Sequence, residues 1–94
     1  MFEKVFAYIL DFPGATKEQY DQVIEKLNLG GKTAPGGMFH LASVTEEGVK
    51  VFDVWESKEA FDKFLSEKLL PIMQELGIKA GDPQVWPVHN ILQK

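Results

Sequence analysis

The 94-residue sequence contains no cysteine. A disulfide framework, a thiolate nucleophile and a cysteine-based zinc site are therefore excluded. This composition suits a reducing compartment, so we expect a cytoplasmic protein. Basic residues are few as well: 10 Lys and Arg stand against 14 Asp and Glu, a formal net charge of −4, and they gather in no patch. The sequence therefore predicts no nucleic-acid partner.

Long apolar runs are also missing, so we expect no membrane span. The opening "MFEKVFAYILDFPG" lacks the basic start and small-residue cleavage site of a signal peptide, and we expect it to be part of the fold. The hydrophobic share of 45% and charged share of 26% are those of ordinary globular proteins. Length and composition together predict one domain over residues 1–94.

The first half of the chain predicts a strand, a helix and a loop. Residues 3–11 alternate with apolar side chains on both faces, which indicates a strand that is covered on both sides. Thr16 and Gln19 have the spacing of a capping box at a helix start. Apolar residues follow at helical spacing until Gly30-Gly31 ends the helix; these are Tyr20, Val23, Ile24 and Leu27.

The second half predicts a hairpin, a helix and a last strand. Strands over 38–45 and 49–56 flank a tight turn at Glu47-Gly48, and Ser57 has the character of a helix N-cap. Pro71 lies inside the helical pattern, where its ring clashes with a carbonyl one turn earlier, so we expect a kink near Leu69-Leu70. Residues 84–92 form the last strand, and its proline, Pro87, favours an edge or a bulge.

The element order is therefore β-α-β-β-α-β. With right-handed crossovers this order gives an α+β, ferredoxin-like antiparallel sheet with two helices on one face. A turn at Glu47-Gly48 places His40 opposite Trp55 and brings both to the same face as Asp53. The other face carries only apolar side chains, which we expect to pack under the helices: Phe39, Leu41, Phe52 and Val54.

By this assignment the face with Asp53 points away from the helices. It also carries Met38, Ala42, Val44, Val51 and Trp55. In water it would be a large apolar patch, and no further chain is left to cover it. We therefore expect the partner to be a second copy of the chain, in a two-fold homodimer that packs sheet against sheet.

The strand-to-helix junction "VWESKEAFDKF" carries a family resemblance. Its Trp55, Ser57, Glu59, Ala60 and Phe61 match a W-x-S-x-E-A-F pattern, so with its element order the chain resembles the dimeric α/β-barrel superfamily, in the antibiotic-biosynthesis-monooxygenase-like (ABM-like) branch. The runs "VFDVWES" and "PVHN" resemble an uncharacterised group within it. The resemblance implies a dimeric α/β barrel, and its members include cofactor-independent oxygenases acting on aromatics, and haem-degrading enzymes.

The haem-degrading members have an Asn in the first strand and a Trp and a His in the second helix. Here the Trp position corresponds to Phe64, and neither the Asn nor the His is present. We therefore expect no haem degradation and no cofactor.

The candidate site is built around Asp53. A carboxylate on an apolar strand face needs a partner, and we expect Asp53 and His40 to form a catalytic acid–base pair at the polar end of a cavity inside the barrel. Trp55 and Tyr8 would form its wall. His89 would join them if the strand alternation after Pro87 places its side chain on the same face. The alternative is structural: a paired Asp53 that only fixes the sheet, with tryptophans that only pack.

A metal site is not expected. His40, His89 and Asp53 have the composition of a two-histidine, one-carboxylate site, but they lie on separate strands without a diagnostic spacing. Three functions remain open. The first is a barrel that binds a hydrophobic or aromatic small molecule, with cofactor-independent monooxygenase-like activity. The second is a non-catalytic sensor or carrier, and the third is a structural dimer without a ligand.

Overall fold

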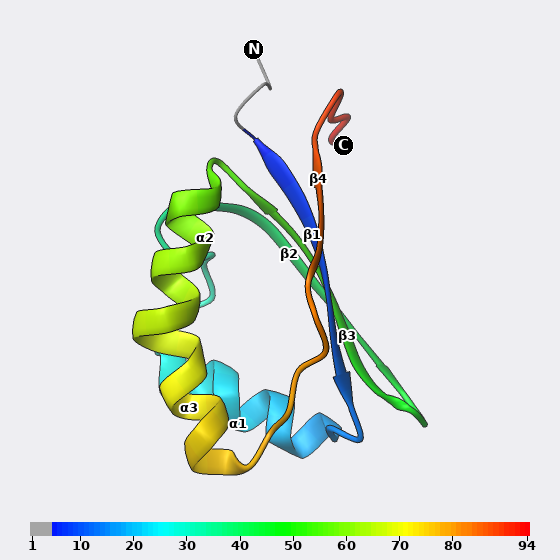
Figure 1. Ribbon diagram of the computed structural model, residues 1–94, viewed down its shortest axis with the longest axis vertical. Coiled ribbons are helices and arrows are strands. Elements are labelled where there is room, and N and C mark those ends of the chain that lie inside the picture. The colour runs from blue at the N-terminus through cyan, green and yellow to red at the C-terminus, as the bar shows by residue number, and fades with distance from the viewer. Residues whose placement is uncertain (1–4) are drawn as a thin grey trace.

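The computed structural model describes residues 5–94 and has the predicted α+β order. Four antiparallel strands form one sheet in the order β2-β3-β1-β4, and the helices lie on one side of it (Figure 1). This is the predicted ferredoxin-like arrangement. Residues 3 and 4 of the predicted first strand lie outside the described residues. The elements are β1 (Phe6–Pro13), α1 (Lys17–Leu27), β2 (Gly37–Thr45), β3 (Gly48–Trp55), α2 (Lys58–Phe64), η1 (Leu65–Leu69), α3 (Leu70–Leu76) and β4 (Gln84–Pro87).

Both predicted N-caps are present. The Thr16 hydroxyl accepts from the Gln19 N–H at 3.1 Å, and the Gln19 side chain accepts from the Thr16 N–H at 3.0 Å, so a full capping box begins α1. The Ser57 hydroxyl accepts from the Ala60 N–H at 3.0 Å and begins α2. The end of α1 comes earlier than predicted, because Asn28 adopts the left-handed conformation and satisfies the last carbonyls before Gly30.

The hairpin turn differs from the prediction by one residue. Thr45 lies opposite Gly48, so the turn residues are Glu46 and Glu47. Gly48 instead begins β3. No side chain fits at this position, because a Cβ there would collide with the Phe12 carbonyl oxygen of β1. The new register pairs His40 with Asp53 and not with Trp55.

The prediction for the two sheet faces is wrong. Trp55 and Asp53 lie under the helices: the Phe61 ring of α2 stacks on Tyr8 at 4.0 Å between centroids and meets Trp55 edge-on at 5.6 Å. Only 3% of Trp55 remains exposed. Both faces carry apolar side chains, so alternation along the strands could not decide which face the crossovers cover. We call this side the helix-covered face; it is formed by Phe6, Tyr8, Leu10, Phe12, His40, Ala42, Val44, Val49, Val51, Asp53 and Trp55.

The opposite side is apolar too. We call it the helix-free face; it is formed by Ala7, Ile9, Phe39, Leu41, Phe52, Val54 and Trp86, with an Asp11–Lys50 ion pair at 3.6 Å toward the hairpin end. Half of Leu41 and half of Trp86 are exposed, at 50% each. No helix of the described chain packs on this side (Figure 1).

The predicted disturbance near Pro71 is confirmed. Between α2 and α3 the helix widens into the π-helical turn η1, in which the Leu70 N–H bonds to the carbonyl of Leu65, five residues back. Pro71 then occupies the first turn of α3, where its missing N–H is not needed. The wider turn relieves the clash that the proline ring would cause in a regular α-helix.

The last strand is shorter than the predicted 84–92 and lies at the sheet edge, beside β1. An edge position tolerates Pro87, as expected, because one side of the strand needs no partner. Across residues 5–94, none of the helices has both the length and the apolar character that crossing a membrane requires.

Candidate functional site

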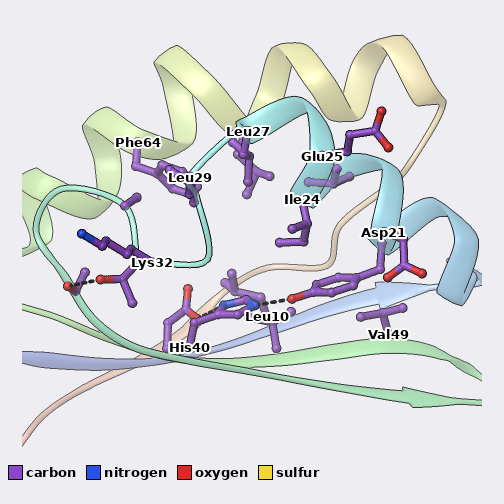
Figure 2. A pocket seen from close by; sticks show the side chains of 18 of the residues that line it. Leu10, Asp21, Ile24, Glu25, Leu27, Leu29, Lys32, His40, Val49 and Phe64 are labelled. Atoms are coloured by element: carbon purple, nitrogen blue, oxygen red, sulfur yellow. Dashed lines mark hydrogen bonds and ion pairs between the residues drawn. The ribbon is translucent and has the colours of Figure 1, made fainter.

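A cavity of about 660 Å³ lies between the helix-covered face and the helical layer. Val49, Val51 and Leu10 form much of its floor, and Ile24 and Leu27 of α1 face them (Figure 2). The loop over residues 28–34 and the helix from α2 to α3 close the remaining sides. The lining is mostly apolar, which is typical of sites for small organic molecules.

A chain of hydrogen bonds crosses this cavity from α1 to the sheet. The Tyr20 hydroxyl lies 2.6 Å from His40 Nε2, and His40 Nδ1 lies 2.7 Å from Asp53 Oδ1. The Trp55 indole N–H donates to the other carboxylate oxygen, Oδ2, at 3.1 Å. Four side chains from three elements thus form one connected polar group in apolar surroundings.

The sheet itself positions the carboxylate. Asp53 lies in the middle of β3, between Tyr8 on β1 and His40 on β2, in one cross-strand row. Adjacent side chains on one face of a sheet are close enough to bond directly. Only 7% of the Asp53 side chain is exposed, while 35% of the His40 side chain is exposed, and both residues line the cavity.

The direction of the hydrogen bonds follows from the protonation states of Asp53 and His40. With Asp53 ionised, its two oxygens can only accept, so His40 Nδ1 must carry a proton. In a neutral imidazole the other nitrogen, Nε2, is then an acceptor, and the Tyr20 hydroxyl donates to it. No buried side-chain nitrogen or oxygen of the described residues is left without a partner.

Tyr20 keeps its proton at neutral pH. Burial raises the pKa of the Tyr20 hydroxyl above its ordinary value of 10.0, and the nearby carboxylates of Asp53 and Asp21 raise it further. The phenol ring also lies parallel to the imidazole of His40, with 6.0 Å between ring centroids and 4° between planes. The hydroxyl is therefore held as a neutral donor toward His40.

Most of the predicted site residues come together, but in another place. Asp53, His40 and Trp55 form one cluster, as predicted from the hairpin, yet it lies under the helices, whereas the prediction placed it on the face away from them. Tyr8 shares their row, but its ring stacks on Phe61 and does not line the cavity. It belongs to the core between sheet and α2.

His89 is not part of the cluster. It follows β4, is exposed and does not line the cavity. The combination of His40, His89 and Asp53 that was weighed as a metal site is therefore not assembled. Over residues 5–94, no group of three or more His, Asp or Glu side chains is placed to hold a metal ion.

The sequence did not identify Tyr20 as a site residue. Its place in the apolar stripe of α1 indicated core packing. Because the helices were predicted on the other face of the sheet, His40 was not expected near it. One signal was available: a tyrosine on the buried side of a helix usually needs a hydrogen-bond partner for its hydroxyl. Only the three-dimensional arrangement shows that this partner is His40, twenty residues away.

Comparison with known sequences gives no assignment, since no family model matches the chain and no curated protein matches it either. Solved structures do match. SnoaB, a cofactor-independent oxygenase from Streptomyces nogalater, superposes with a TM-score of 0.68 at 14% identity, over 97% of this chain and 99% of that one. The chain has the fold of the ABM-like proteins.

Two further structures support this. A putative antibiotic biosynthesis monooxygenase from Chloroflexus aurantiacus aligns with a TM-score of 0.65 at 18% identity, over 95% of this chain and 97% of that one. Another, from Deinococcus radiodurans, aligns with a TM-score of 0.59 at 12% identity, over 96% and 97%. At such low identity the likeness concerns the fold, and the ABM-like resemblance is confirmed at that level.

Proposed function

We propose that the protein binds a hydrophobic or aromatic small molecule in the 660 Å³ cavity and oxidises it with dioxygen without a cofactor. The observation that carries this proposal is the Tyr20–His40–Asp53 chain in an otherwise apolar cavity. An apolar pocket with one polar anchor suits a largely apolar ligand. The fold shared with SnoaB, which is described as a cofactor-independent oxygenase, supports the reaction class.

The proposed reaction is the conversion of an activated CH₂ group of the substrate into C=O. For CH₂, the balance is CH₂ + O₂ → C=O + H₂O, so the substrate supplies all the electrons. The protein's part is to remove a proton, because a substrate anion gives up electrons to O₂ more readily than the neutral molecule. His40 is the proposed base, and the Asp53 carboxylate stabilises its protonated form.

A ligand carrier is the second candidate. Both ring nitrogens of His40 are already bonded within the protein, to Asp53 and Tyr20, and Asp53 is also bonded to Trp55. A fully bonded polar cluster can anchor a ligand without any proton transfer. This candidate uses the same cavity and differs only in the absence of turnover.

We also propose that two copies associate through the helix-free face. Leu41, Phe39 and Trp86 are about half exposed there, and such a contiguous apolar surface indicates an interaction site. A two-fold pair of sheets would cover it with the same residues from each copy, as the predicted barrel requires. The face is not the one predicted, so Trp55 and Val51 take no part in this association.

Native mass spectrometry of the protein purified from its own host tests the ligand-binding proposal. A bound apolar molecule of a few hundred daltons is expected in addition to the chain. Oxygen consumption by the protein with that molecule then separates the two candidates, because an oxygenase consumes O₂ in proportion to product and a carrier consumes none. A protein that never retains or binds a small molecule would leave only the structural dimer.

A further inference from the structure

The Tyr20 hydroxyl is the end of the polar chain that faces the cavity. Asp53 has both oxygens engaged, by His40 and Trp55, and His40 has both nitrogens engaged, by Asp53 and Tyr20. A phenol oxygen that donates one hydrogen bond can still accept another. Asp53 could accept further bonds but is only 7% exposed, so the accessible unused acceptor of these hydrogen-bonded side chains is the Tyr20 oxygen.

This remaining capacity has a direction. When His40 is neutral and carries its proton on Nδ1, Tyr20 donates to Nε2, so the Tyr20 oxygen offers an acceptor to the cavity and not a donor. A ligand that covers a polar group without meeting its hydrogen-bonding capacity loses affinity, so the cavity discriminates by hydrogen-bond type. A ligand with an O–H satisfies the Tyr20 oxygen, whereas an ether or a ketone of the same shape does not.

We propose that Tyr20 contacts the ligand directly, and that the ligand carries a hydroxyl, as a phenol or enol, which donates to the Tyr20 oxygen. The proposal rests on the proposed binding function of the cavity and assigns the contact to a residue of α1. Asp53 then positions His40, and His40 is the base that acts through Tyr20.

The same geometry provides a path for the substrate proton. As the ligand O–H bond breaks, its proton passes to the Tyr20 oxygen while the Tyr20 proton passes to His40 Nε2. Tyr20 is regenerated, the ligand becomes an anion hydrogen-bonded to Tyr20, and His40 becomes an imidazolium beside the Asp53 carboxylate. The net change is the transfer of one proton from the ligand to His40, without any electron, so the step needs no further reactant. It delivers the substrate anion that reaction with O₂ requires.

Affinities for 2-naphthol and 2-methoxynaphthalene test the contact. The two probes differ only in O–H against O–CH₃, and at about pH 8 a phenolic hydroxyl is largely neutral. Calorimetric titration of the wild-type protein should show 2-naphthol binding about 5-fold more tightly, the effect of one hydrogen bond. In Tyr20→Phe this ratio should fall to about 1, and in Tyr8→Phe it should persist.

Tyr8→Phe is the matched control, because Tyr8 is buried but does not line the cavity. Circular dichroism confirms that each variant is folded, and the ratio is informative because a purely structural role of Tyr20 would change both affinities alike. An equal ratio in wild type and Tyr20→Phe, or a wild-type preference for the ether, would overturn the contact while leaving the binding cavity intact. Failure of both probes to bind the wild-type protein would instead remove the proposed function, and the contact with it.

Discussion

The two faces of the sheet are both apolar, yet they differ in how their side chains are used. The helix-covered face buries Trp55 and surrounds the single carboxylate, Asp53, with hydrogen-bond partners. The helix-free face leaves Trp86 and Leu41 half exposed and carries its charged pair, Asp11 and Lys50, toward the hairpin end. Each face thus has one tryptophan and one aspartate. Trp55 and Asp53 are buried, whereas Trp86 and Asp11 are about half exposed.

The two faces therefore have different tasks, one for ligand binding and one for association, whereas the sequence pattern assigned both tasks to one face. Burial of a carboxylate is costly unless it is bonded, so the presence of Asp53 under the helices with two hydrogen-bond partners indicates a site that is built for a polar task. An exposed apolar face without such a group indicates association. Ligand binding and dimer formation are therefore expected to respond to different mutations.

The two tryptophans give the largest expected contrast. Trp55→Ala should lower the free energy of unfolding by about 3–5 kcal/mol, because it removes a fully packed ring. Trp86→Ala should change the stability of the monomer by no more than about 0.5 kcal/mol, as for an exposed residue. Urea unfolding at a protein concentration that keeps the wild type monomeric measures both. Equal losses would contradict the assignment of the two faces.

A charge on the helix-free face should act on association. Leu41→Glu places a carboxylate where an apolar side chain meets the second copy, and should weaken the dimer about 100-fold without unfolding the subunit. Sedimentation velocity over a range of concentrations measures this. The control is Ala42→Glu at the neighbouring position of β2, which points toward the cavity side and should reduce stability more than association.

The aspartates of the two central strands give the next contrast, in the unfolding free energy that each contributes. Asp53→Ala leaves the Trp55 N–H and His40 without their acceptor and should cost about 1–3 kcal/mol of unfolding free energy. Asp11→Ala removes a half-exposed ion pair with Lys50 at 3.6 Å and should cost about 0–1 kcal/mol. Thermal or urea unfolding compares them. A loss for Asp11→Ala as large as that for Asp53→Ala would contradict the difference drawn between the two faces.

The smallest effect concerns alkaline pH. Burial and nearby carboxylates raise the folded-state pKa of both Tyr20 and Tyr8 above 10.0. The folded state therefore holds these protons more tightly, so their contribution to stability is complete below about pH 10 and is lost as pH rises through the folded-state pKa values. Between about pH 9 and 11, unfolding free energy should fall less steeply in Tyr20→Phe than in wild type. Identical slopes would contradict this.

Much of this arrangement could be predicted from the sequence. Element order, both N-caps, the break caused by Pro71 and the edge position of β4 follow from local chemistry, and the period of two in a strand was enough to group Asp53, Trp55 and His40. Register was less certain: Glu46-Glu47 forms the turn because Gly48 is needed beside Phe12, a contact between distant residues.

The choice of face could not be made from the sequence. Phe39, Leu41, Phe52 and Val54 form a purely apolar set, which favoured them as the core, while the carboxylate of Asp53 argued against burial. Burial of Asp53 becomes favourable only when His40 and Trp55 supply hydrogen bonds and when α1 brings Tyr20 to the other side of the imidazole. Such a cluster depends on tertiary contacts that no local pattern records.

The indole N–H signals of the two tryptophans test the central claim most directly. In a proton–nitrogen NMR spectrum of the labelled protein, Trp55 reports on the cavity through its bond to Asp53, and Trp86 reports on the helix-free face. Assignment uses Trp86→Phe. Titration with 2-naphthol should shift the Trp55 indole signal in a saturable way and leave that of Trp86 unchanged. A saturable shift of Trp86 with no change at Trp55 would place the ligand on the other face and contradict the account.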